Sequence, residues 1–239
     1  MSKNAVVFGA TSGIGKELAM LLMNDGYTVA ITGRRAEKLA ELKATNPEKY
    51  ISKQHDATDV KASDVVFQEL IEEMGTLDLV VYSSGVGGPN YDLEWEKEVP
   101  TIATNVTGAV KIFGLAYNLF KKQGFGHLVG ISSIAGVRGN RHVPCYFASK
   151  AFMNSYLESL WMKAQRSKAK IYVTDIVPGF VETKMATGST FWKAPLDKAT
   201  KQVFSAIQRK KKKAYITKRW RLVAILVRIA PAKIVMKYL

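Results

Sequence analysis

A tyrosine and a lysine four positions apart, Tyr146 and Lys150, are the residues in this sequence most readily paired for chemistry. They begin an apolar run with helical spacing, so both side chains are expected on one face of a helix. A free phenol has a pKa of about 10, and a cation within about 4 to 6 Å lowers that pKa by stabilising the phenolate. The pair is therefore predicted to give or take a proton. The competing interpretation is a half-buried ring beside a lysine whose head reaches solvent.

A serine stands near this pair in the predicted fold. Ser133 lies thirteen residues before Tyr146 and follows the apolar run 128–131, which predicts the end of a strand. Its neighbour Ser132 is expected to face the other way, because side chains alternate along a strand. Cys145 is interpreted as a small packing residue, since no base is placed to activate it. The three histidines lack metal-ligand spacing, so no metal site is predicted.

Three glycines near the N-terminus form the second motif. The apolar run 4–9 predicts a strand buried on both faces, and it leads into Gly9, Gly13 and Gly15 before a helical pattern begins. A strand, a glycine turn and a helix N-terminus together form the setting that holds a pyrophosphate. The spacing is G-x3-G-x-G, which differs from the G-x-G-x-x-G of other dinucleotide folds.

Together, the glycine turn and the Ser-x12-Tyr-x3-Lys set resemble the short-chain dehydrogenase/reductase family, classical type, over about residues 5–217. The resemblance implies an α/β, Rossmann-type doubly wound sheet of about seven parallel strands with helices on both faces. It also implies NADP-dependent interconversion of a carbonyl and an alcohol on a small-molecule substrate. Residues 1–217 are predicted to form the NADP-binding catalytic domain, and residues 218–239 a basic and apolar C-terminal segment of the same domain.

The resemblance assigns four catalytic residues. Ser133 would hydrogen-bond the substrate oxygen, and Tyr146 would protonate it. Lys150 would hold the nicotinamide ribose, lower the Tyr146 pKa and return the proton with the help of Asn105 and water. Asn105 lies inside a helix predicted over residues 101–120, where an asparagine is unfavourable, and such local faults often mark function.

The cofactor is predicted to be NADP (NADPH). Gly33 stands after the predicted strand 27–32 where folds that choose NAD carry a carboxylate, and in the family that this sequence resembles an arginine at the next position, here Arg34, marks a preference for NADP. Arg35, Thr11 and Ser12 are the expected helpers, and a solvent-exposed arginine pair is the alternative. By resemblance, the cofactor contacts are Gly9, Thr11, Ser12, Gly13, Ile14, Gly15, Arg34, Arg35, Asp56, Ala57, Gly85, Tyr146, Lys150, Pro178, Gly179, Val181 and Thr183.

The sequence departs from the family pattern at two places. Phe8 replaces the usual threonine before the glycine turn, and residues 82–84 (Tyr-Ser-Ser) replace Asn-Asn-Ala before Gly85. Asp56 is expected at the adenine, although Asp56 or Asp59 could instead cap the following helix. The segment 185–192 is the expected substrate loop, and its two aromatic rings favour an apolar substrate.

The formal charge of +15 is concentrated at the C-terminus, since residues 198–239 contain thirteen Lys or Arg and no Asp or Glu. No nucleic-acid partner is predicted, because the recognition motifs are absent. The apolar run 222–227 is far shorter than the roughly 20 residues of a membrane span. The segment 218–239 is interpreted either as an interfacial helix in peripheral contact with a membrane or as packing against the core or a sister subunit.

The remaining expectations concern location, assembly and rival functions. A start without a leader pattern and a single cysteine predict a cytoplasmic protein, membrane-peripheral if the C-terminal segment binds lipid. By resemblance, a homodimer or homotetramer would form through the helices that carry Asn105 and Tyr146. A non-catalytic NADP-binding sensor or scaffold and a membrane-peripheral reductase of lipid-like substrates are the alternative functions.

Overall fold

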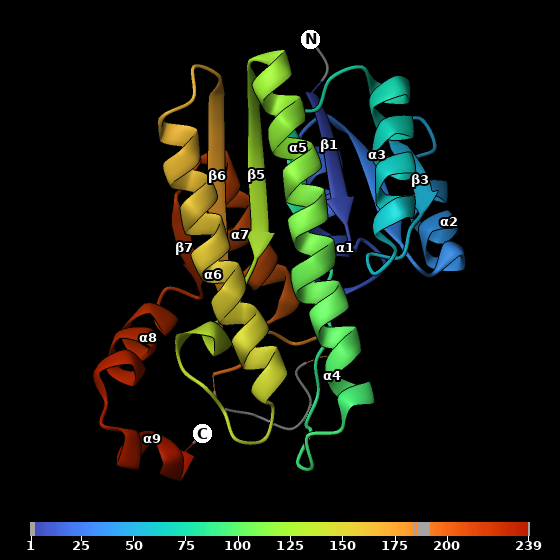
Figure 1. Cartoon of the computed structure of the whole chain (residues 1–239). Coiled ribbons are helices and arrows are strands. Elements are labelled where there is room, and N and C mark those ends of the chain that lie inside the picture. The colour runs from blue at the N-terminus through green and yellow to red at the C-terminus, as the bar shows by residue number, and fades with distance from the viewer. Residues whose placement is uncertain (1–2, 184, 186–191, 239) are drawn as a thin grey trace.

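The chain forms one seven-stranded parallel sheet covered on both faces by helices, as the computed structural model in Figure 1 shows. The structure describes residues 3–183, 185 and 192–238. The strand order is β3-β2-β1-β4-β5-β6-β7, which confirms the predicted doubly wound sheet. The strands are β1 (Lys3–Phe8), β2 (Tyr27–Gly33), β3 (Tyr50–Gln54), β4 (Leu79–Tyr82), β5 (Phe125–Ile131), β6 (Lys170–Pro178) and β7 (Lys213–Ile216).

Alternating side chains of the strands join the two helical layers to the sheet. In β1, Ala5 and Val7 belong to one apolar core and Val6 and Phe8 to the other, and all four are fully buried. Helices α3, α5 and α6 cover the near face in Figure 1, with α1 and α7 behind the sheet. The helices are α1 (Gly13–Asn24), α2 (Ala36–Ala44), α3 (Val60–Met74), α4 (Trp95–Ile102), α5 (Ala109–Gln123), α6 (Pro144–Gln165), α7 (Leu196–Gln208), α8 (Trp220–Ile229) and α9 (Ala232–Tyr238).

The helix predicted over residues 101–120 begins earlier and is interrupted. Helix α4 passes into a π-helical turn at Ala103–Gly108, which continues as α5. Together, α4, this turn and α5 form the one helix among the described residues that is long and apolar enough to cross a membrane. Its apolar side is used for packing, because Ile112, Phe113 and Phe120 are fully buried against the sheet.

The carboxyl ends of the strands meet at one edge of the sheet, at the bottom of Figure 1. Strands β1 and β4 are neighbours in the sheet, but the chain leaves β1 toward β2 on one side and leaves β4 toward β5 on the other. In open α/β sheets, ligands bind in the crevice at such a switch point. Helices α8 and α9 project from the same end of the molecule (Figure 1).

Candidate active site

A cavity of about 1110 Å³ lies at the carboxyl edge of the sheet. It brings together residues that are far apart in the sequence, from the turn after β1 to helix α8. Every site residue expected from the sequence lines it, except Gly15 and Asn105. Their placement agrees with the expected site, while the role of each residue stays a prediction.

The glycine turn packs tightly on the start of helix α1. A Cβ atom on Gly15 would lie 2.2 Å from the backbone oxygen of Gly9, so only glycine allows this approach. Gly9 itself has a φ of +89°, which other residues rarely adopt. The first N–H groups of a helix lack partners within the helix, and here they lie beside the cavity. The turn therefore has the shape and the polarity that a pyrophosphate requires.

The two arginines after β2 have different surroundings. The Arg35 guanidinium donates hydrogen bonds to Thr11 Oγ1 at 2.6 Å and to Ser12 Oγ at 2.8 Å. Arg34 lies near Asp56, whose pKa it helps to lower, and both arginines line the cavity. Arg35 is therefore bound to the glycine turn through Thr11 and Ser12, and both arginines are at the wall of the same cavity.

The structure distinguishes Asp56 from Asp59, the two aspartates that the sequence leaves as alternatives for capping the helix that follows them. Asp59 caps helix α3, because its Oδ1 accepts hydrogen bonds from the N–H groups of Lys61 and Ala62. Asp56 lines the cavity and accepts from the N–H and the hydroxyl of Thr58. Burial raises the Asp56 pKa, but these hydrogen bonds and Arg34 outweigh it, so the pKa is lowered. Asp56 is thus an ionised acceptor at the cavity wall.

Ser133 and Tyr146 meet at the cavity from η2 (Ile134–Val137), which Ser133 caps, and from α6. Burial raises the pKa of the Tyr146 phenol above its ordinary value, and a hydrogen bond with Ser133 lowers it in part. The sequence predicts the opposite direction, through Lys150. The Lys150 Nζ is 5.7 Å from the centre of the Tyr146 ring, and the direction of the Tyr146 pKa is set by the loss of phenolate solvation on burial.

Lys150 is buried, and its Nζ donates a hydrogen bond to the backbone oxygen of Ile131 at 3.0 Å. Burial lowers its pKa from 10.5 to about 8, and Asp175 opposes the shift. Asp175 is itself buried and accepts from Ser132 Oγ at 2.5 Å. Sequence reasoning missed this carboxylate, although an aspartate inside an otherwise apolar strand was a visible signal.

Asn105 joins two sides of the site from the π-helical turn. Its Oδ1 accepts from the Val86 N–H at 2.9 Å, and its Nδ2 donates to the Val86 oxygen and to Ser149 Oγ. A Cβ atom on Gly85 would lie 3.4 Å from Lys150 Nζ and 3.5 Å from Asn105 Oδ1. The lysine and the amide therefore border the same small space beside Gly85.

Tyr82 takes the place of the asparagine that the resemblance would put there. Its hydroxyl donates to the Thr104 oxygen at 2.5 Å, and its ring is buried against Phe113. The bond joins strand β4 to the π-helical turn that carries Asn105. Ser83 and Ser84, the other two departures, line the cavity near Gly9, where a Cβ atom would lie 2.8 Å from Ser84 Oγ.

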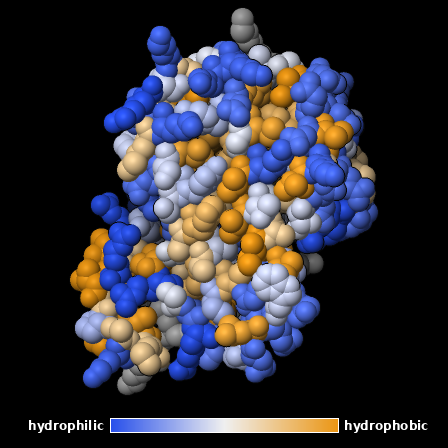
Figure 2. Space-filling view, in the orientation of Figure 1, coloured by the Kyte–Doolittle hydropathy of each residue, from blue (hydrophilic) through white to orange (hydrophobic). Residues whose placement is uncertain are grey.

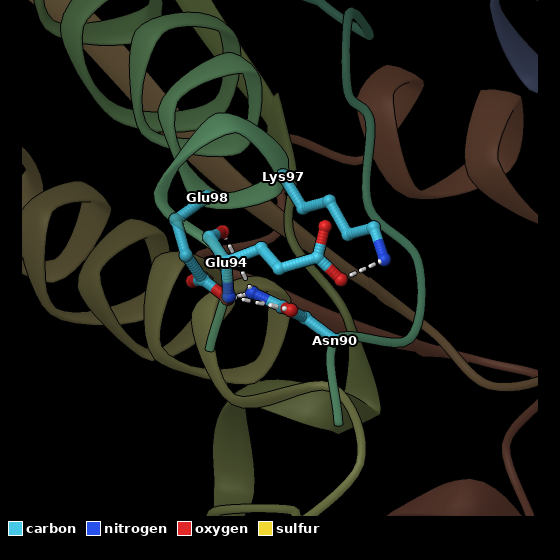
Figure 3. A network of polar contacts seen from close by, with 4 residues as sticks. All are labelled: Asn90, Glu94, Lys97 and Glu98. Atoms are coloured by element: carbon cyan, nitrogen blue, oxygen red, sulfur yellow. Dashed lines mark hydrogen bonds and ion pairs between the residues drawn. The ribbon is translucent and has the colours of Figure 1, made fainter. Parts of the chain in front are cut away.

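Asn90 is a second residue that sequence reasoning missed. It is buried in the loop after β4, where it hydrogen-bonds Glu94 and Glu98 (Figure 3). Its N–H also donates to the His142 oxygen at 2.8 Å, which links this loop to the segment before Tyr146. The network joins the two chain segments that enclose the cavity, and no signal in the spacing of the sequence indicated it.

Cys145 is placed as expected of a packing residue. Its thiol contacts the backbone oxygen of Glu98 at 3.7 Å, and burial, with a smaller effect of Glu98, raises its pKa to about 12. A protonated thiol is a poor nucleophile. Within the described residues, no group of three His, Cys, Asp or Glu side chains could hold a metal ion.

The remaining wall combines the turn after β6 with helix α8. Trp220, Val223 and Val227 line the cavity, a role that the sequence did not predict for the C-terminal segment. Their spacing of three and four residues was the available signal. Trp220 packs edge-on against Phe180 and Trp192, with ring centres 5.4 and 6.1 Å away. Of the expected substrate loop, residues 185–192, residues 186–191 lie outside the described residues.

Comparison with known sequences identifies relatives along most of the chain. A family model for short chain dehydrogenase matches residues 3–194. An uncharacterized oxidoreductase of Myxococcus xanthus is 36% identical over 194 residues, 79% of this chain and 76% of the relative. Carbonyl reductase family member 4 of Xenopus laevis is 30% identical over 189 residues, 78% of this chain and 79% of the relative.

Solved structures with the same fold include ElxO with NADP bound. It has a TM-score of 0.81 and 21% identity, and the match covers 90% of this chain and 97% of that one. Acetoin dehydrogenase YohF from Salmonella typhimurium has a TM-score of 0.79 and 19% identity over 90% of this chain and 94% of that one. At these identities the likeness concerns the fold.

Proposed function

This chain belongs to the short-chain dehydrogenase/reductase family, and we propose that it is an NADP(H)-dependent oxidoreductase that interconverts a carbonyl and an alcohol on an apolar substrate. The observation that carries the proposal is the meeting of Ser133, Tyr146 and Lys150 in the same cavity as the glycine turn and its arginines. A nucleotide binder without chemistry would need the turn and the arginines alone.

NADPH fits the residues at the β1 end of the cavity. The glycine turn would hold the pyrophosphate, Arg34 and Arg35 the ribose phosphate, and Asp56 with Ala57 the adenine. Toward the other end, Lys150 and Gly85 would hold the nicotinamide ribose, and Pro178, Gly179, Val181 and Thr183 the carboxamide. When bound, NADPH supplies a hydride to the carbonyl carbon. The solved relative ElxO binds NADP, which supports this choice.

The residues of this chain then stabilise and neutralise the negative charge that develops on the substrate oxygen. Ser133 donates a hydrogen bond to that oxygen, and Tyr146 transfers its phenolic proton to it, so that a carbonyl, a hydride and a proton become an alcohol. A raised pKa keeps Tyr146 protonated at neutral pH, which suits an acid waiting for substrate. Negative charge builds on the oxygen only during reaction, so these donors favour the transition state.

Lys150 and Asn105 are assigned to the recovery of the proton. After transfer, the phenolate of Tyr146 must regain a proton before the next turnover. The Lys150 Nζ lies 5.7 Å from the centre of the Tyr146 ring, and a pKa of about 8 lets it exchange a proton near neutral pH. Asn105 borders the space beside Lys150, where a water molecule would complete the path.

The substrate is proposed to be apolar. Phe180 and Trp220 line the cavity beside Val223 and Val227, and the Trp192 ring packs edge-on against Trp220. Such a wall favours hydrocarbon over charged groups. The homodimer or homotetramer expected from the resemblance, and the cytoplasmic location, stay predictions.

Replacement of Tyr146 by phenylalanine tests the proposed function. Tyr146→Phe removes the proton donor and leaves the ring, so turnover of an aldehyde with NADPH is expected to fall by about 10²- to 10⁴-fold. NADPH binding, measured by fluorescence titration, is expected to stay within about threefold of the wild type, because the hydroxyl is a small part of that site. Loss of NADPH binding, or turnover that survives, would contradict the assignment.

A further inference from the structure

Helix α8 has two apolar faces, which is unusual for a helix at the surface. One face carries Trp220, Val223 and Val227, which line the active-site cavity. The other carries Leu222, Ile225, Leu226 and Ile229, whose exposed fractions are 67%, 49%, 63% and 73%. A surface helix normally directs charged and polar residues outward. The outer face of α8 is therefore an apolar surface directly behind the wall of the cavity.

This apolar surface continues onto α9, and the segment that forms it is rich in positive charge. Ile234 and Met236 of α9 are 54% and 67% exposed. Figure 2 shows hydrophobic side chains gathered over α8 at the lower left, with strongly hydrophilic ones beside them. Residues 218–239 contain six Lys or Arg, and no Asp or Glu occurs after residue 197.

Contacts with the core hold α8 in this position. Trp220 and Ala224 are buried, and a Cβ atom on Gly179 would lie 2.1 Å from the Trp220 indole, so the turn after β6 accepts only glycine beneath the ring. The Arg138 guanidinium donates to the backbone oxygen of Arg228 at 3.1 Å. The exposed face is thus presented by an anchored helix, with Trp220 and Ala224 as its buried contacts.

We propose that the exposed apolar face of α8 and α9 binds the surface of an anionic membrane, and that the cavity takes an apolar carbonyl compound dissolved in that membrane. The substrate part of this inference rests on the proposed function. Helices of ten and seven residues are too short to span a bilayer, so they would lie in its surface. Apolar side chains would enter the lipid, while the arginines and lysines contact the acidic headgroups.

The charge complementarity selects this occupant. A cationic rim around apolar residues matches an acidic lipid surface, whereas two copies of the same cationic segment would repel each other. One face of α8 lines the cavity, and the opposite face would contact the membrane. A long-chain substrate would therefore pass from the lipid to the cavity along this helix.

Flotation of the full chain with vesicles tests the membrane contact. The wild type is expected to float with vesicles of phosphatidylcholine and phosphatidylglycerol, and to stay in solution with phosphatidylcholine alone. The double variant Leu226→Asp/Ile229→Asp should reduce the bound fraction by about tenfold. Val65→Asp/Met162→Asp changes two equally apolar positions elsewhere, 58% and 55% exposed, and is expected to float as the wild type does.

The substrate part is tested with two aldehydes. Hexadecanal dissolved in the anionic vesicles and a short, water-soluble aldehyde are each reduced with NADPH. Leu226→Asp/Ile229→Asp should slow the first reaction by about tenfold and leave the second, and NADPH binding, unchanged, because neither residue lines the cavity.

The outcomes separate the two proposals. A wild type that reduces the soluble aldehyde but does not float overturns the membrane inference and leaves the proposed function standing. Failure to bind NADPH overturns the proposed function, while flotation still decides the membrane contact. If the chain does not float and the double variant converts a dimer to a monomer in sedimentation, a second copy covers this face and the inference is wrong.

Discussion

Replacement of Lys150 by methionine should lower the activity and raise the free energy of unfolding at pH 7. A fall of the Lys150 pKa from 10.5 to about 8 means that the folded protein holds a buried cation at a cost. At about 1.4 kcal/mol per pKa unit, the cost at pH 7 is about 3 kcal/mol. Methionine has a similar length and no charge. The substitution also removes the hydrogen bond to the Ile131 oxygen, and this loss reduces the gain in stability by about 1 kcal/mol. We expect Lys150→Met to be more stable at pH 7 by about 2 kcal/mol.

The advantage should disappear as the pH rises. Below pH 8 the lysine is charged in both the folded and the unfolded chain, so the cost is fully present. Between about pH 8 and 10.5 the folded chain gives up the proton while the unfolded chain keeps it, and wild-type stability rises relative to the variant. Above that range both states are neutral and the cost is gone. The variant should then be the less stable protein, by about 1 kcal/mol for its lost hydrogen bond.

The measurement is urea unfolding of both proteins from pH 7 to pH 10, followed by tryptophan fluorescence. The chain has four tryptophans, of which Trp220 is buried. Lys121→Met, at an exposed lysine in the last turn of α5, is the matched control and should show a difference from wild type that does not change with pH. A Lys150→Met difference that is equally constant would refute the reasoning, because it would mean that the buried lysine does not carry a depressed pKa.

Two further predictions concern the cofactor and the π-helical turn. Arg34→Asp should reverse the preference from NADPH toward NADH, because a carboxylate would then directly follow β2. Arg35→Asp should weaken the binding of both cofactors, since Arg35 donates hydrogen bonds to Thr11 and Ser12. Fluorescence titration with each nucleotide checks this, and an unchanged NADPH preference in Arg34→Asp would contradict it. Tyr82→Phe removes the donor to the Thr104 oxygen and should lower the free energy of unfolding by about 1 to 3 kcal/mol. Urea unfolding measures the loss, and a variant as stable as the wild type would show that the bond contributes nothing.

The sequence alone determined the architecture and which motifs lie together at the carboxyl edge of the sheet. Apolar runs of strand length, alternating with amphipathic helical patterns, predict a parallel sheet whatever the distant contacts are. The motifs around Gly9, Ser133, Tyr146 and Lys150 are local, since each depends on residues a few positions apart. Because the carboxyl ends of parallel strands share one edge, residues that follow those strands must gather there.

Tertiary structure decided the electrostatics and the far wall of the cavity. The Tyr146 pKa is raised although a lysine lies one helical turn away, because burial depends on every element packed around the ring. Asp175 and Asn90 contact residues distant in the sequence, so no local pattern shows which partners they have. Helix α8 reads as a single apolar run in the sequence. Only its docking onto the turn after β6 divides it into a face that lines the cavity and a face exposed to solvent.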